Sequence, residues 1–322
     1  MALSDTWDFT TAPAVPRSDA WRQVGLFYLL TTALSLAVWI PFAAQLDGLL
    51  PGHIPAWLVV ASQYSPTAVA LALVAREGGL AGLAAFLRRS LRLGVGVRWF
   101  AVALLTPLLM GLGLLLLHAA EGAYVPTLAS LPAVQSHLAH AFVDLKDASG
   151  GASNAFGNLL ARWASPGLLQ ALLIYCGVCF ANGGLSEEAG WRGYALSRLL
   201  PGRRAIVAVL IIGFFWGVWH TGPAFWAGVF QSNWRVLAIP LEYTLGTIPL
   251  TVMIAWVFLG AKQSLLPGMV FHACYNGTFF FLTQIWTPGR PVVSILEWLA
   301  ASYVAAAIVA VAGRRTLFAR QA

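Results

Sequence analysis

Residues 171–193, ALLIYCGVCFANGGLSEEAGWRG, decide the fold of this chain. The stretch begins as an apolar run, and a membrane-spanning helix requires about 20 predominantly apolar residues. Two adjacent carboxylates and an arginine follow directly, as Glu187, Glu188 and Arg192. A charged side chain near the bilayer centre costs at least about 2.5–3.5 kcal/mol, so charges at that depth indicate a functional site. The stretch therefore predicts a membrane protein whose functional site contains these charged residues.

The composition extends this interpretation to the whole chain. Hydrophobic residues make up 59% of the 322 positions, charged residues only 10%, and the mean hydropathy is +0.75. Soluble domains contain about 25% charged residues. No polar block interrupts the apolar segments, which predicts one membrane domain over residues 1–322 in contact with the lipid bilayer. The net charge of +7 does not point to nucleic acid, because Lys and Arg gather in the cytoplasmic loops of polytopic proteins.

The apolar segments predict an all-α, polytopic fold with about eight transmembrane helices. They are residues 24–45, 55–75, 99–117, 167–199, 205–221, 236–259, 264–285 and 293–312. The fourth segment contains the acidic pair. Two other acids lie near predicted span ends, Glu242 and Glu297, and we expect both to reach the outer interface.

The distribution of basic residues predicts the orientation of the spans. With the N-terminus inside, 14 of the 19 Lys and Arg residues lie on the cytoplasmic side and four lie outside, leaving Arg192 within a span. Both termini are therefore expected in the cytoplasm. We interpret Arg88, Arg89 and Arg92, after GGLAGLAAFL, as a positive-inside anchor rather than the end of an interfacial helix. The Ala-, Leu- and Trp-rich composition favours a bacterial inner membrane.

Two groups of residues carry weaker signals. Three cysteines lie in apolar segments and three histidines in the predicted outer loop 118–166: Cys176, Cys179 and Cys274, and His118, His137 and His140. Thiols in such segments behave as small hydrophobic groups, so we expect no disulfide. The histidines lack a partner motif and are expected to be polar surface rather than metal ligands.

Helix geometry predicts which polar groups can meet. A tight turn at residues 200–204 separates two spans; Glu187 lies 16 residues before Arg203, and His220 lies 16 residues after Arg204. At 1.5 Å per residue, both lie about 24 Å from the turn and hence at the same depth in an antiparallel pair. His272 and Asn276, spaced i, i+4, share one face of a later span. Glu188 and Arg192 have the same spacing, so Arg192 is expected to neutralise Glu188 and leave Glu187 free.

This set of residues favours hydrolysis of an amide bond. Glu187, near an imidazole, is suited to take a proton from water, and His272 and Asn276 are suited to donate hydrogen bonds to the developing oxyanion. A zinc site formed by Glu187, His220 and His272 is an alternative, because two histidines and one carboxylate are a known catalytic zinc set. The sequence does not separate the two. We expect no required cofactor, with a divalent metal as the open alternative.

Three motifs resemble those of the CAAX-processing and bacteriocin-processing (CPBP, or Abi) family of intramembrane endopeptidases. They are E-E-x-x-x-R at residues 187–192, F-x-x-x-H at 216–220 and H-x-x-x-N at 272–276. The second departs from the family pattern, having Trp216 in place of phenylalanine. The resemblance covers about residues 165–285, which it marks as the protease core.

The resemblance implies a glutamate-dependent protease of a membrane-associated protein or peptide, with a CAAX-type or bacteriocin-immunity role. It implies that Glu187 and His220 activate water, that His272 and Asn276 stabilise the oxyanion, and that Glu188 and Arg192 belong to the same site. Two other functions stay open at this point. Buried acids and histidines also line the proton or ion pathways of transporters, although no inverted repeat is visible in the sequence. A member of the family can also act as a non-catalytic scaffold.

Overall fold

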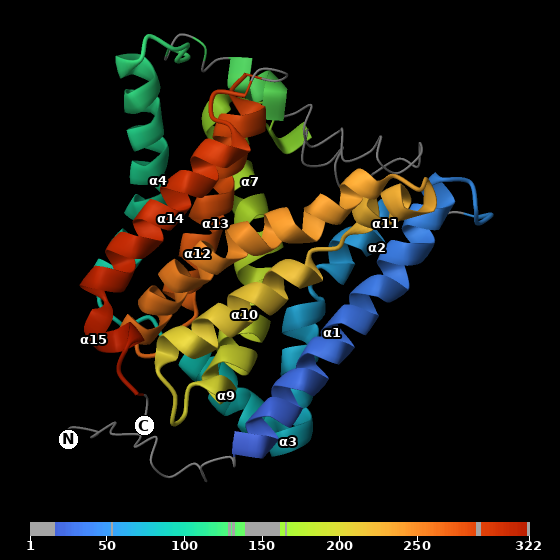
Figure 1. Ribbon diagram of the computed structural model, residues 1–322, viewed down its shortest axis with the longest axis vertical. Coiled ribbons are helices and arrows are strands. Elements are labelled where there is room, and N and C mark those ends of the chain that lie inside the picture. The colour runs from blue at the N-terminus through green and yellow to red at the C-terminus, as the bar shows by residue number, and fades with distance from the viewer. Residues whose placement is uncertain are drawn as a thin grey trace.

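The computed structural model describes residues 17–52, 54–127, 130, 133–138, 162–164, 166–287 and 291–320. Its described segments form an all-helical bundle (Figure 1). The longer helices are α1 (Arg17–Leu46), α3 (Ser65–Ser90), α4 (Val97–Ala120), α7 (Leu168–Cys179), α10 (Ala205–Trp219), α12 (Ala238–Gly260), α13 (Leu266–Phe280) and α14 (Ile295–Ala312). The shorter named helices outside the central stretch are α2 (Ala56–Ser62), α11 (Pro223–Phe230), η6 (Trp234–Leu237), η7 (Phe281–Ile285) and α15 (Arg314–Leu317).

Each of the eight predicted segments contains helix, and six helical stretches among the described residues are long and apolar enough to cross a membrane. Those six contain α1, α3, α4, the stretch Leu168–Leu199, α12 and α14. The helices α10 and α13 have 15 residues each, which is shorter than the usual span. The chain is thus a multi-pass membrane protein, while the predicted count of eight crossings and the location of the termini stay predictions.

The second predicted segment, 55–75, was wrong in its boundaries. The chain breaks between α2 and α3, where Pro66 occupies the first turn of the new helix, a position that proline favours. The stretch labelled α3 continues to Ser90, but the non-helical backbone at Gly79 divides it into two helices, and the second of them carries the LAGLAAFL part of GGLAGLAAFL. Gly79 has a φ of 60° and a ψ of −161°, a backbone conformation accessible essentially to glycine alone, and this kinks α3.

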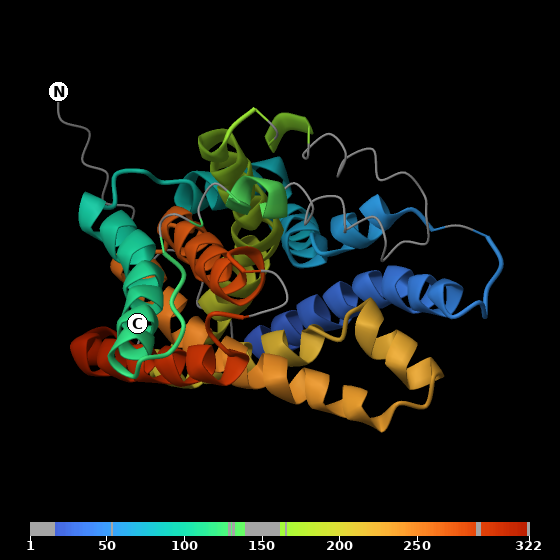
Figure 2. The same ribbon diagram turned by 90° about the horizontal axis from the view of Figure 1, so that it is seen from above.

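A composite helix runs through the centre of the bundle and carries the acidic pair (Figure 2). It consists of α7, η4 (Phe180–Leu185), α8 (Ser186–Glu188), η5 (Ala189–Leu196) and α9 (Ser197–Leu199). The helix α13 packs against α7 and η4, while α3 packs against α8 and η5. The helix α10 contacts η5 and lies along α12. Helices from both sides of the sequence therefore surround the acidic pair.

Basic side chains connect several helices at one end of the bundle. Arg198 donates to Gln23 and forms an ion pair with Glu77, while Arg89 donates to the carbonyl of Gly193. These contacts join α1, α3 and α9, which lie at the lower end of Figure 1 together with α15. The gathering of positive charge at one end is the pattern from which the cytoplasmic side was predicted.

The weaker predictions have separate outcomes. The three cysteines are free thiols, as expected. His118 was placed in a loop, but α4 extends to Ala120 and the buried His118 side chain bonds to Glu297. His137 bonds to the carbonyl of Ile285, and His140 lies outside the described residues. Glu297 also caps the N-terminus of α14.

Candidate active site

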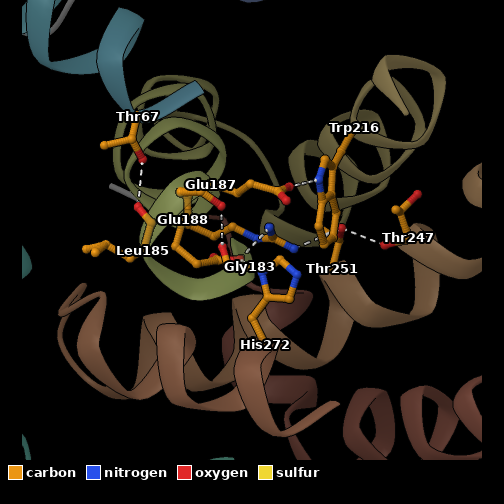
Figure 3. Close-up of polar contacts among 11 residues, drawn as sticks. Thr67, Gly183, Leu185, Glu187, Glu188, Trp216, Thr247, Thr251 and His272 are labelled. Atoms are coloured by element: carbon orange, nitrogen blue, oxygen red, sulfur yellow. Dashed lines mark hydrogen bonds and ion pairs between the residues drawn. The ribbon is translucent and has the colours of Figure 1, made fainter. Parts of the chain in front are cut away.

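The two adjacent carboxylates leave the central helix in different directions (Figure 3). Glu187 and Glu188 occupy a short α-helical turn between two π-helical segments, η4 and η5. A π turn places an extra residue in the helix, rotates the side chains that follow, and occurs frequently at functional sites. Glu187 is only 3% exposed and Glu188 is fully buried. Each carboxylate therefore depends on protein groups for its hydrogen bonds.

Glu188 belongs to a buried ion-pair network. Its Oε1 accepts from Nη1 of Arg192 at 3.0 Å and lies 2.8 Å from Nδ1 of His272. The predicted i, i+4 pair of Glu188 with Arg192 is thus present. Arg192, also fully buried, donates in addition to Oγ1 of Thr251 at 3.2 Å. Removing one partner from such a network leaves a buried charge uncompensated, so these groups hold one another in place.

Glu187 has a different environment. Its Oε2 accepts a hydrogen bond from the indole Nε1 of Trp216 at 2.5 Å, and Figure 3 shows its side chain pointing toward that ring. Within the part of the chain that the structure describes, no Lys, Arg or His forms an ion pair with Glu187. A carboxylate held by a neutral donor keeps its negative charge available for a reacting proton. Glu187 is thus chemically distinct from its neighbour.

His220 lies at the C-terminal end of α10, one turn after Trp216. Its Nδ1 donates to the main-chain carbonyl of Trp216 at 2.8 Å, which leaves Nε2 with a free lone pair in the neutral ring. The imidazole stacks on Tyr243, with ring centroids 4.7 Å apart and planes 11° from parallel. Both contacts fix the orientation of the ring. Glu187 and His220 consequently meet at one residue, Trp216, which binds the first by its side chain and the second by its backbone.

His272 and Asn276 converge on Gly183. A Cβ atom at Gly183 would lie 3.1 Å from Nε2 of His272 and 3.0 Å from Nδ2 of Asn276. The absence of a side chain at this position leaves room for both polar groups beside the helix that carries Glu187. The i, i+4 spacing of these residues on α13 thus produces the shared face that the sequence predicted. Both nitrogens therefore lie beside the same point of the central helix.

Glycine also sets the distance between the helices that build the site. A Cβ at Gly184 would lie 2.5 Å from the carbonyl oxygen of Met269 on α13, and one at Gly190 would lie 2.6 Å from that of Pro66 on α3. Glycine therefore lets two backbones approach the central helix closely. Next to Gly184, the backbone that approaches is that of α13.

Five of the six predicted site residues are linked by contacts, directly or through Trp216: Glu187, Glu188, Arg192, His220 and His272. Asn276 lies beside His272 next to Gly183. Sequence reasoning missed the hydrogen bond from Trp216 to Glu187. It also missed Thr251, a fully buried partner of Arg192. The available signal for Thr251 was a run of threonines on one face of an otherwise apolar span, at 244, 247 and 251.

Glu187, His220 and His272 are the donors that the zinc alternative requires. Glu187 accepts from the Trp216 indole, while Nδ1 of His220 is engaged by the Trp216 carbonyl and Nδ1 of His272 by Glu188, so Nε2 stays open on each ring. Over the described residues, no group of three or more His, Cys, Asp or Glu side chains is arranged to hold a metal ion. A metal role for these three residues stays a prediction.

Comparisons with known proteins match the part of the chain that contains this candidate site. The model of a family described as type II CAAX prenyl endopeptidase Rce1-like matches residues 168–278, about a third of the 322-residue chain. The chain is also similar to CAAX prenyl protease 2 of Methanococcus maripaludis, with 30% identity over 92 residues. That alignment covers 28% of this chain and 34% of the relative, so the match spans about a third of the relative's length. The matched segment contains the central helix, α10 and the part of α13 that carries His272 and Asn276.

Proposed function

Because residues 168–278 match the model of a type II CAAX prenyl endopeptidase Rce1-like family, we propose that this chain is an intramembrane endopeptidase in which Glu187 activates water. The observation that carries the proposal is the contrast between the two buried acids. Glu188 is neutralised by Arg192, whereas Glu187 is held by a neutral N–H group beside His220. This arrangement leaves one carboxylate as a base inside an otherwise charge-balanced site.

The proposed reaction begins when a water molecule adds to the carbonyl carbon of the scissile peptide bond. Glu187 takes one proton from that water, and the Nε2 lone pair of His220 holds the water by accepting its second hydrogen. The carbonyl oxygen becomes an oxyanion. The C–N bond then breaks, and Glu187 returns its proton to the leaving nitrogen. Atoms and charge balance with water as the only co-reactant.

The oxyanion requires donors, and His272 and Asn276 are the candidates. The Nδ2 group of Asn276 donates in every protonation state. With Nδ1–H of His272 directed at Glu188, its Nε2 donates only when the ring is doubly protonated. In that form Glu187, Glu188, Arg192 and His272 carry a net charge of zero, which lowers the cost of burying them.

The substrate is proposed to be a membrane-associated polypeptide with a CAAX-type C-terminus, because the relative is a CAAX prenyl protease. A bacterial cell membrane is the proposed location, supported by the Ala-, Leu- and Trp-rich composition. A metal requirement and a transport function are the alternatives that an experiment must separate.

The test uses the full chain purified in detergent and its Glu187→Gln variant. Farnesylated and unprenylated peptides with a C-terminal CAAX sequence are incubated with each protein, with and without a chelator, and products are identified by mass spectrometry. We expect the wild-type chain alone to produce a cleaved peptide, with the chelator having no effect. Loss of cleavage in chelator would establish metal dependence. Solute flux in liposomes without cleavage of any peptide would contradict the protease proposal.

A further inference from the structure

The indole of Trp216 lies at the centre of the ionisable groups of the site. The residue is only 1% exposed. Its ring face lies 4.2 Å from the guanidinium carbon of Arg192, and its ring centroid lies 5.2 Å from that of His272 in an edge-to-face arrangement. Its main-chain carbonyl accepts from His220. One residue therefore contacts an arginine and both imidazoles, besides the carboxylate of Glu187.

Most of these contacts need only an aromatic ring or a backbone. The attraction to Arg192 uses the ring face, the packing with His272 uses the ring edge, and His220 binds a main-chain atom. The contact with Glu187 is different, because it requires the indole N–H group. Phenylalanine at this position would keep the aromatic ring and the main-chain carbonyl, and would lose only the donor. Substitution by phenylalanine therefore removes the hydrogen bond to Glu187 while keeping the other contacts of this residue.

We propose that Trp216 is a positioning residue that fixes the Glu187 carboxylate for proton transfer through its indole N–H group. The inference rests on the proposed function of Glu187. The indole N–H group donates to Oε2 of Glu187 at 2.5 Å, and a hydrogen bond to an ionised carboxylate is stronger than one between neutral groups. The bond anchors Oε2, so the carboxylate cannot turn toward Arg192, and its other oxygen is left in a fixed place.

The orientation matters because a neighbouring cation competes for this carboxylate. The ring of Trp216 lies between Glu187, at its nitrogen, and Arg192, at its face. Arg192 already binds Glu188 and Thr251. Without the indole donor, the closest strong donors available to Glu187 belong to that network, and an ion pair there would neutralise the base. Trp216 thus keeps the two acids in separate roles.

The chain supplies a matched control in Trp191. It is also 1% exposed, and its indole nitrogen is buried without a hydrogen-bond partner among the described residues. Its ring packs against other aromatic groups, Phe27 and Trp219 among them. Trp191→Phe and Trp216→Phe therefore remove the same atoms from equally buried sites. Only the second substitution removes a hydrogen bond.

The experiment measures kcat and KM for the wild-type chain and the two variants, with thermal unfolding to confirm that each folds. We expect Trp216→Phe to lower kcat about 10- to 100-fold, which corresponds to about 1.4–2.7 kcal/mol, with KM within about twofold of wild type. Trp191→Phe should keep kcat within about threefold. Equal losses in both variants, or an unchanged kcat in Trp216→Phe, would overturn the inference.

A second measurement does not depend on cleavage. In chain labelled with ¹⁵N-tryptophan, the indole resonance that disappears in Trp216→Phe is that of Trp216. We expect this resonance to shift in Glu187→Gln and to stay in place in Glu77→Gln, where the ion pair with Arg198 lies elsewhere. An unmoved resonance in Glu187→Gln refutes the hydrogen bond. If the wild-type chain cleaves no peptide while the resonance shifts, the proposed function fails and the contact stands.

Discussion

Replacing Glu188 by glutamine tests whether the buried ion-pair network holds the site together. Glutamine has nearly the same shape as glutamate and removes only the charge. In the wild-type chain, Oε1 of Glu188 lies 3.0 Å from Nη1 of Arg192 and 2.8 Å from Nδ1 of His272. Glu188 and Arg192 are fully buried, and His272 is 2% exposed. The substitution therefore leaves the buried Arg192 cation without its carboxylate partner.

Breaking a buried ion pair by removing one partner costs about 3–5 kcal/mol, because the remaining charge is uncompensated. We expect Glu188→Gln to lower the free energy of unfolding by this amount. Glu77→Gln is the matched control. It alters the ion pair with Arg198, in which the side chains are 36% and 18% exposed, and such pairs contribute about 0–1 kcal/mol. Unfolding by SDS titration in mixed micelles measures both differences.

A double substitution sharpens the test. In Glu188→Gln with Arg192→Met, the stranded cation is removed, so we expect part of the lost stability to return. The reasoning is refuted if Glu188→Gln costs no more than Glu77→Gln. It is equally refuted if the double variant is less stable than the sum of its single variants predicts.

Other contacts give further predictions. Gly184→Ala places a Cβ 2.5 Å from the carbonyl oxygen of Met269, so we expect a loss of about 1–3 kcal/mol in thermal unfolding assays and lower cleavage activity. Gly177→Ala, on the same central helix with nothing within 4 Å, should change neither property; equal losses in both would contradict the packing argument. Ser294→Ala removes the capping box with Glu297 and should cost about 1 kcal/mol in SDS unfolding without altering cleavage; unchanged stability would refute the cap.

The sequence allowed most of the helices to be located, because lipid-facing segments are apolar over a full span. It failed where a helix boundary depends on a single residue. Pro66 starts α3 inside what reads as one apolar run, and the non-helical Gly79 divides α3 into two helices at a kink. Mean hydropathy is taken over a whole segment, so it does not reveal a helix boundary that depends on one residue. The π-helical segments beside Glu187 were also invisible, since no residue type marks an i to i+5 hydrogen bond.

The sequence predicted which residues form the candidate site, but not the contacts that those residues make between helices. Regular spacing placed Arg192 with Glu188 and Asn276 with His272, because both pairs lie on single helices. Contacts between helices depend on how each helix is rotated, which sequence periodicity did not fix here. The bond from His272 to Glu188 and the one from Trp216 to Glu187 are of this kind. The catalytic roles of these residues stay predictions.

The central claim is that Glu187 is the base of a peptidase, and the most direct measurement compares kcat/KM for the wild-type chain, Glu187→Gln and Glu242→Gln. Glu242 is an exposed acid, so its substitution controls for the loss of a carboxylate elsewhere. Loss of a general base lowers the rate about 10²- to 10⁴-fold. We predict a loss in this range for Glu187→Gln and a value within about twofold of wild type for Glu242→Gln. Full cleavage by folded Glu187→Gln would contradict the account.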